Sequence, residues 1–273
     1  MFPKSDIYRR FIEDNFKIVD KRGEVVDFRL NAPQLRYLEE GTAQDIILKS
    51  RQEGFSSLID AIFTADFLLK NNSFSVVVAD VEDNAVGLLD RIKIFIASFE
   101  EKHKVKIPLK YNSRFELYNE AINSRFVIGT AKNTEFGRSK TITNLHLSEC
   151  AFYPNIPKII AGAGQAVVDG GKKIFETTAN GYNDFRDFYY RSRQGLTGYK
   201  TIFFPASEFY TPEFLQKKRD ELGDMYEQEY PETEDAAFLT TGKMYFNRDA
   251  VKEYLTYASN YPQRGTNVLL ETV

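Results

Sequence analysis

Apolar positions along the chain form short continuous runs and longer stretches with helical spacing, and these alternate in order. Strands are predicted at residues 45–48, 75–79, 142–147 and 173–178, with two more inside 115–131, around Asn119–Asn123. Helices are predicted after Ser56 as far as Leu69, and at 84–101, 157–168 and 183–193. Strands that alternate with helices indicate an α/β fold with a mostly parallel central sheet flanked by helices. Ligands of such sheets bind beyond the carboxyl ends of the strands.

The pattern changes near Phe209, where the chain becomes charged and rich in tyrosine. Helical pieces are expected at 211–222 and 247–258, with an irregular stretch between them. We therefore predict three parts. They are an N-terminal helical or lid segment at 1–33, a core at 34–208, and a linker or lid subdomain at 209–273.

Composition narrows the class of protein. Of the 273 residues, 42% are hydrophobic and 14% aromatic, enough for a substantial core. The net charge of −3 gives no overall basic field, so any contact with a polyanion must use local patches. The single cysteine, Cys150, cannot form an internal disulfide and suits a reducing compartment. Since neither a signal peptide nor a bilayer-spanning apolar run is present, we expect a soluble intracellular protein.

Residues 46–57 have the strand–loop–helix order of a phosphate-binding loop, but not the residues that usually form one. The pattern G-x-x-x-x-G-K-[ST] would place a glycine at Ser50 and a lysine at Phe55. If the segment binds ATP, its positive charge must come from Lys49 or Arg51, and Ser56 takes the magnesium-hydroxyl position. An ordinary surface turn explains this segment taken alone equally well. The predicted ATP-binding residues of the loop are Lys49, Ser50, Arg51, Gln52, Glu53, Gly54, Phe55, Ser56 and Ser57.

Hydrolysis also needs a carboxylate that orients the attacking water. The apolar strand at 142–147 leads into Ser148 and Glu149, which places Glu149 where a general base belongs. An aspartate would normally stand at Ser148 and hold the magnesium water; a hydroxyl can still bind that water but adds no charge. A lone glutamate at a strand end is more often simply solvated.

Two further segments could complete such a site. Glu176–Gly181 ends a strand in small polar residues, and Thr178 or Asn180 could sense the γ-phosphate, although Asn-Gly is also a plain turn signal. Arg138 lies in a stretch from which it could reach the ATP of a neighbouring subunit. His146 and His103 are expected to do no chemistry.

Taken together, these motifs resemble the ATPase domain of the large terminase subunit of tailed bacteriophages, over residues 28–246 or so. The segment 49–57 resembles the family's deviant phosphate loop (Walker A), which in some members carries its lysine first. Residues 145–152 resemble its acidic strand motif (Walker B), and Thr177-Thr178-Ala179-Asn180-Gly181 its coupling motif. Gln228–Pro231 and Ala236–Phe238 are also typical of the family.

The resemblance implies a P-loop NTPase fold of the ASCE type (additional strand, catalytic glutamate) and an ATPase that uses ATP and magnesium. It implies that Gln34 recognises adenine, that Ser56 and Ser148 support magnesium, partly through water, and that Thr177 belongs to the coupling segment with Thr178 and Asn180. Catalytic roles fall to Glu149 and to a trans-acting arginine, for which Arg138 is the first candidate and Arg125 the second.

The expected partners are double-stranded DNA, the portal protein, the small terminase subunit and further copies in a ring, five being the expected number, in the cytoplasm of an infected bacterium. Large terminases also carry a C-terminal nuclease, and we expect no nuclease activity from these 273 residues. Two alternatives stay open. One is another DNA translocase or helicase-type ATPase, and the other is a nucleotide-binding interaction module with little hydrolysis.

Overall fold

The structure, a computed structural model, describes residues 5–133, 141–238, 253, 254, 256 and 257. Its strands are β1 (Lys17–Val19), β2 (Val25–Asp27), β3 (Gln44–Lys49), β4 (Phe74–Ala79), β5 (Leu109–Asn112), β6 (Glu116–Asn119), β7 (Ser124–Thr130), β8 (Ile142–Ser148), β9 (Val167–Thr177) and β10 (Lys200–Phe204). Its helices are α1 (Ser5–Asn15), α2 (Ala32–Glu40), α3 (Phe55–Leu69), α4 (Glu82–His103), α5 (Ile156–Gly162), α6 (Asp184–Arg193), α7 (Pro212–Leu222), α8 (Tyr226–Glu229) and α9 (Glu234–Ala237).

An eight-stranded sheet forms the centre, in the order β10-β3-β9-β8-β4-β7-β6-β5. The strands from β10 to β7 are parallel, and β6 and β5 continue the sheet antiparallel. Strand β9 lies between β3, which leads into the phosphate loop, and β8, which carries Ser148 at its end. An additional strand between these two is what the ASCE arrangement requires, and the predicted fold class is confirmed.

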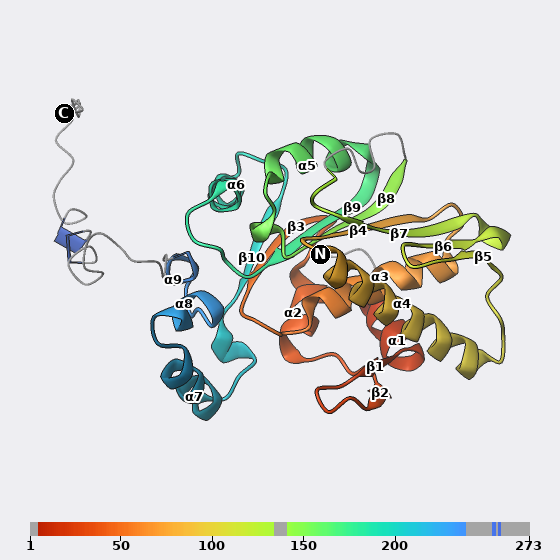
Figure 1. Ribbon diagram of the computed structural model, residues 1–273, viewed down its shortest axis with the longest axis horizontal. Coiled ribbons are helices and arrows are strands. Elements are labelled where there is room, and N and C mark those ends of the chain that lie inside the picture. The colour runs from red at the N-terminus through yellow and green to blue at the C-terminus, as the bar shows by residue number, and fades with distance from the viewer. Residues whose placement is uncertain (1–4, 134–140, 239–252, 255, 258–273) are drawn as a thin grey trace. The chain divides into compact units, whose positions relative to one another are not determined.

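Helices cover both faces of the sheet (Figure 1): α1 to α4 lie on one side, and α5 and α6 on the other. Each face has its own apolar core. Phe63, Phe95 and Phe126 belong to the first, and Leu145, Phe175 and Tyr189 to the second. A third, smaller core of Tyr210, Leu215, Tyr226 and Tyr230 holds together the segment from Ala206 to Tyr230. Both faces of the parallel strands are thus buried, as their continuous apolar runs predicted.

Most predicted elements are confirmed, with one correction. The helix expected at 157–168 ends at Gly162; a short 3-10 turn follows, and β9 begins already at Val167. Glycine makes this early start possible, because a Cβ on Gly171 would lie 2.6 Å from Val167 Cγ1 and 2.8 Å from the Thr143 carbonyl. Helix α1 lies within the N-terminal segment predicted to be helical or a lid, although no bounds were predicted for it. The pattern missed α2, α8, α9, β1, β2, β5 and β10, while the helix expected at 247–258 lies mostly outside the described residues.

Residues 1–239 form one compact unit and 240–273 a second, of which only four residues are described. Within the first unit, α1 packs on α3 and α4. The boundaries predicted at 33/34 and 208/209 stay predictions. Of the helices in the described parts of the chain, none is both long and apolar enough to cross a membrane.

Candidate active site

The phosphate loop joins β3 to α3 and is held by its own backbone geometry. Gln52 and Gly54 both have left-handed backbone conformations, at φ 59° and φ 83°. Gly54 is the N-cap of α3, so the first amides of that helix face the loop. Phe55, at the position of the usual lysine, is instead buried in the core with its ring 4.4 Å from that of Phe204. Only its backbone is available to a nucleotide.

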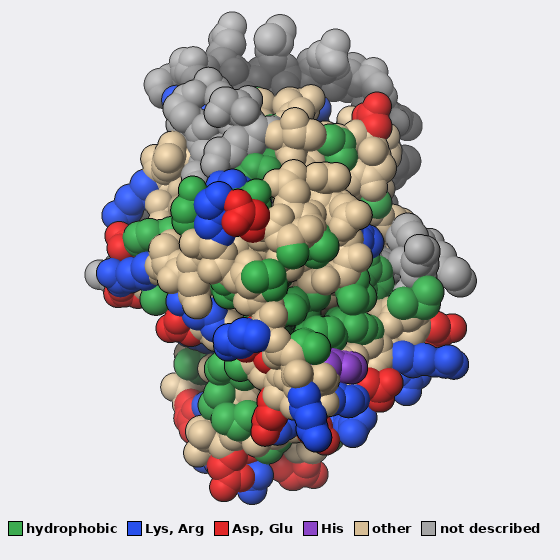
Figure 2. Space-filling model, turned by 90° about the vertical axis from the view of Figure 1, so that its right-hand side faces the viewer, with side chains coloured by type: hydrophobic (Ala, Val, Ile, Leu, Met, Phe, Trp, Pro, Cys, Tyr) green, Lys and Arg blue, Asp and Glu red, His purple; other side chains and the backbone are tan. Residues whose placement is uncertain are grey.

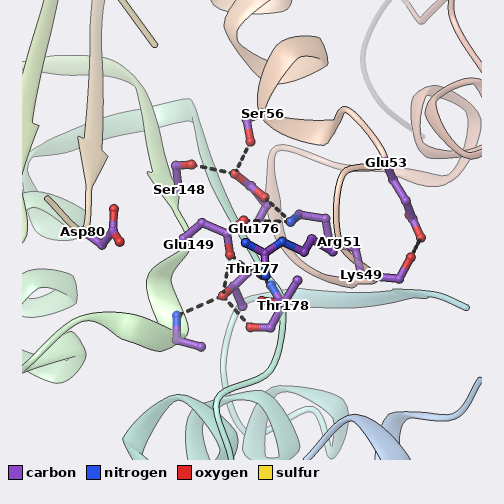
Figure 3. Close-up of polar contacts among 12 residues, drawn as sticks. Lys49, Arg51, Glu53, Ser56, Asp80, Ser148, Glu149, Glu176, Thr177 and Thr178 are labelled. Carbon is purple, nitrogen blue, oxygen red and sulfur yellow. Dashed lines mark hydrogen bonds and ion pairs between the residues drawn. The ribbon is translucent and has the colours of Figure 1, made fainter. Parts of the chain in front are cut away.

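Lys49 lies beneath the loop between two carboxylates (Figure 3). Its Nζ is 2.9 Å from Glu149 Oε1 and 3.2 Å from Glu176 Oε2, and its side chain is 4% exposed. Burial opposes the charge on Lys49, but the two carboxylates outweigh it and raise the pKa of Lys49 above its ordinary value. The lysine is therefore a fixed positive charge at physiological pH.

Arg51 has a different environment. Its guanidinium is largely exposed and pairs with Glu229 at 3.0 Å, and its backbone N–H donates to the Glu229 carbonyl. The hydroxyl of Tyr210 donates to the Arg51 carbonyl at 2.6 Å. The segment that follows β10 thus contacts the loop directly.

Glu149 follows β8 in a left-handed conformation, with φ 55°. A non-glycine residue in this region is strained, and such strain is common at functional sites. The backbone N–H of Thr178 and the hydroxyl of Thr177 donate to Glu149 Oε2 at 3.1 and 3.3 Å. Two donors from the predicted coupling segment and Lys49 therefore fix the direction of this carboxylate, which is still about one third exposed.

A cleft of about 550 Å³ opens at this edge of the sheet, within the size range of ligand sites. Arg51, Ser56, Ser148, Glu149 and Thr178 line it, together with Asp80 and residues of α4 such as Arg91. These side chains come from loops and strand ends far apart in sequence. The carboxyl ends of β3, β4, β8 and β9 bring them to one place, as the topology predicts.

The other predicted residues lie around this group or away from it. Gln34 is buried behind the loop: its Oε1 accepts from the Asn31 N–H in a capping box, and its Nε2 donates to the Gly54 carbonyl at 2.7 Å. Ser50 donates to Glu53, whose burial raises its pKa to about 8. Asn180 donates to the Ala151 carbonyl, and Ser57 lies in the first turn of α3. Adenine recognition by Gln34 stays a prediction.

Of the two arginine candidates, only Arg125 lies among the described residues, and it does not join the site of its own chain. Arg125 is the second residue of β7, at the amino ends of the parallel strands and opposite the cleft, where it pairs with Glu116 and stacks on Tyr118. It therefore cannot act on the ATP of its own chain, and a trans-acting role stays a prediction. Arg138 lies outside the described residues.

Sequence reasoning missed two residues in the floor of the site. Glu176 is completely buried and accepts from Ser56 and Ser148, and His146 Nε2 lies 3.5 Å from it. His146 also contacts Asp60 at 3.2 Å, and Asp60 pairs with Arg91. Burial opposes protonation of His146, but Asp60 and Glu176 raise its pKa to about 9. In the sequence, the only sign that Glu176 could belong to the site was its position as a charged residue within an apolar strand.

Comparisons with known proteins agree with this arrangement. No protein-family model and no curated protein sequence matches the chain. Among solved structures, the large terminase ATPase domain of Thermus phage P74-26 is similar over 76% of this chain and 92% of its own, with 18% identity and a TM-score of 0.59. The large terminase of bacteriophage HK97 is similar over 83% of this chain and 53% of its own, with 14% identity and a TM-score of 0.64.

The large terminase of the thermophilic bacteriophage D6E, in complex with ATP-gamma-S, is similar over 74% of this chain and 51% of its own, with 13% identity and a TM-score of 0.53. At such identities the likeness speaks for the fold and not for each residue. The chain has the fold of the ATPase domain of bacteriophage large terminases, a P-loop NTPase fold.

Proposed function

We propose that this chain is an ATP-hydrolysing motor domain of a phage large terminase, which couples hydrolysis to the movement of double-stranded DNA into a procapsid in the host cytoplasm. The fold and the cleft support ATP binding. The resemblance is also the basis on which we propose the partners. They are double-stranded DNA, the portal protein, the small terminase subunit and further copies in a ring.

One observation carries the chemistry. Glu149 stands at the cleft wall beside the phosphate loop, with Lys49 Nζ 2.9 Å from one oxygen and the Thr178 amide 3.1 Å from the other. A carboxylate held in this way, and still open to solvent, suits a group that accepts a proton from water. In this proposal Glu149 polarises the attacking water, and Lys49 offsets charge that develops on the γ-phosphate.

Thr177 and Thr178 contact the proposed base directly, so a change at the phosphates can reach β9 through two hydrogen bonds. These contacts support the proposed coupling role. Magnesium, when bound, would neutralise charge on the phosphates. Ser56 and Ser148, whose hydroxyls are both within 2.7 Å of Glu176, would lie next to it.

The test is Glu149→Gln, which keeps the shape of the side chain and removes its basicity. We expect binding of a non-hydrolysable ATP analogue to stay within a few-fold of the wild type, while steady-state phosphate release falls by at least about 100-fold. Glu82→Gln, at the exposed start of α4, is the matched control and should change neither. Unchanged turnover in Glu149→Gln would remove the mechanism, and no analogue binding by the wild type would favour an interaction module.

A further inference from the structure

Ser148 stands where an aspartate is usual, so this position supplies no carboxylate, but Glu176 of the neighbouring strand lies beside it. Ser148 ends β8 directly opposite Glu176 of β9 in the parallel register. The hydroxyls of Ser56 and Ser148 both donate to Glu176 Oε1, each at 2.7 Å (Figure 3). The P-loop hydroxyl and the residue at the acidic-strand position thus meet at a glutamate from the next strand.

Glu176 is completely buried, and two basic side chains face it: Lys49 Nζ lies 3.2 Å from Oε2 and His146 Nε2 lies 3.5 Å from Oε1. An ionised carboxylate in the interior is costly unless it is paired or holds a metal. Its pairing here is incomplete, because Oε2 accepts no hydrogen bond even though Lys49 Nζ lies 3.2 Å away.

The donors fit magnesium. Mg²⁺ prefers oxygen ligands, and in nucleotide sites it uses one or two protein groups together with phosphates and water. Two hydroxyls and a carboxylate oxygen are such donors.

We propose that Glu176 takes over the role of the aspartate that would normally stand at position 148. In this role it supplies the protein carboxylate for the magnesium ion that accompanies ATP. Ser148 then orients this carboxylate, and Ser56 keeps its place beside the ion. The negative charge has moved one strand along the sheet, from β8 to β9. This inference rests on the proposed binding of ATP with magnesium.

The test measures the affinity of a non-hydrolysable ATP analogue by calorimetry, in EDTA and in Mg²⁺, for the wild type and Glu176→Gln. We expect Mg²⁺ to strengthen binding to the wild type and Glu176→Gln to lose about 10- to 100-fold of this enhancement. Asp45→Asn removes another fully buried carboxylate, at the opposite end of β3, and should keep the enhancement. Full retention of the Mg²⁺ effect in Glu176→Gln would overturn the proposal.

Moving the carboxylate to another residue distinguishes magnesium binding by Glu176 from simple pairing of Glu176 with Lys49. The double variant Glu176→Gln with Ser148→Asp returns the carboxylate to β8, and we expect it to regain most of the Mg²⁺ enhancement. Ser148→Asp alone places two carboxylates together and should lower the thermal unfolding temperature. A double variant that stays as insensitive to Mg²⁺ as Glu176→Gln would overturn the proposal and leave Glu176 as a partner of Lys49.

A wild-type measurement covers the case in which Glu176→Gln does not fold. In a crystal of the wild type with the analogue and Mn²⁺, the anomalous signal places the ion. We expect a carboxylate oxygen of Glu176 among the direct ligands of the ion, and an ion coordinated by Ser148 or Ser56 without Glu176 would overturn the inference. Binding with a Glu176-independent Mg²⁺ effect refutes this inference alone, whereas no analogue binding under either condition refutes the proposed function.

Discussion

Lys49 and Arg51 lie two positions apart but differ in what they can do. Lys49 is buried and holds two carboxylates, one of them the proposed base. Arg51 is mostly exposed and pairs with Glu229. Lys49 Nζ is held beside Glu149, where the proposed hydrolysis would take place. Arg51 forms an exposed ion pair with Glu229, and such pairs contribute little to stability. In the proposed mechanism, Lys49 therefore supplies the main charge at the phosphates.

Lys49→Ala should be the more damaging of two matched variants. It leaves Glu176 buried without its lysine, so we expect the free energy of unfolding to fall by about 3–5 kcal/mol and phosphate release to be lost. Arg51→Ala should cost less than about 1 kcal/mol and reduce phosphate release only several-fold. Urea unfolding and phosphate-release assays check both, and the opposite ranking of the two activities would assign the phosphate charge to Arg51.

Glu53 makes a pH-dependent contribution to stability. Its buried Oε2 has no hydrogen-bond partner, and burial, opposed by Ser50 and Lys49 and reinforced by Glu208, raises its pKa from 4.5 to about 8. The folded state therefore keeps this proton at a pH where the unfolded state has lost it. The resulting stabilisation is complete below about pH 4.5 and is lost as the pH rises through about 8.

Glu53→Gln lacks this titration and should gain stability relative to the wild type between pH 5 and pH 9. The difference should reach the order of 3–5 kcal/mol as an upper bound. Urea unfolding of both proteins at the two pH values measures it, with Glu39→Gln as an exposed control. A difference that does not depend on pH would show that Glu53 is ionised in the folded protein.

At the scale of elements, the start of α3 depends on the residue behind the loop. The Gln34 side chain caps α2 and also holds the Gly54 carbonyl, so it joins two helices through one amide group. Gly54 has φ 83°, and a Cβ there would lie 2.9 Å from Gln34 Nε2. Glycine is thus required twice, by the backbone conformation and by the close approach.

Gly54→Ala and Gly23→Ala separate these two requirements. Gly23 has φ 82°, but a Cβ added there would have no atom within 4 Å, so its variant meets only the backbone cost of about 1–2 kcal/mol. Gly54→Ala should cost clearly more and weaken binding of the ATP analogue. Chemical unfolding and calorimetry check this, and equal costs for the two variants would mean that Gln34 moves aside freely.

At the scale of the whole molecule, the candidate site lies at the carboxyl ends of the parallel strands, at one edge of the sheet. Figure 2 views the molecule from the side of the β5–β6 edge, where basic and acidic side chains are interspersed over the described surface. Arg125 lies at the amino ends of the strands, away from its own cleft. If an arginine acts on the γ-phosphate bound by another copy, hydrolysis at full rate requires an assembly of copies. We therefore expect isolated chains to hydrolyse ATP slowly.

Mixing two inactive variants tests the assembly. Arg138→Ala keeps Glu149, and Glu149→Gln keeps Arg138, so a mixture should regain part of the wild-type phosphate release if the arginine acts between copies. Wild-type hydrolysis should also rise more than linearly with protein concentration. Each variant alone is the control. No recovery in the mixture, together with a constant rate per chain, would contradict a trans-acting Arg138.

The sequence by itself determined the order of most strands and helices, the strand–loop–helix order at residues 46–57 and the strand-end position of Glu149. These features depend on neighbours in the chain, since apolar period and turn residues are local signals. The same local signals were weak for β10, a five-residue edge strand, and for the end of α5, where β9 begins earlier than its pattern indicates.

Only the tertiary structure decided how the charges meet. The sequence showed that Ser148 lacks a carboxylate, but the insertion of β9 between β3 and β8 is what places Glu176 against Ser148 and Ser56. It also decided that Lys49 is buried, that Gln34 lies behind the loop and that Arg125 lies at the far end of the sheet. Strand order and register join residues more than 100 positions apart, and a pattern of neighbouring residues carries no record of that pairing.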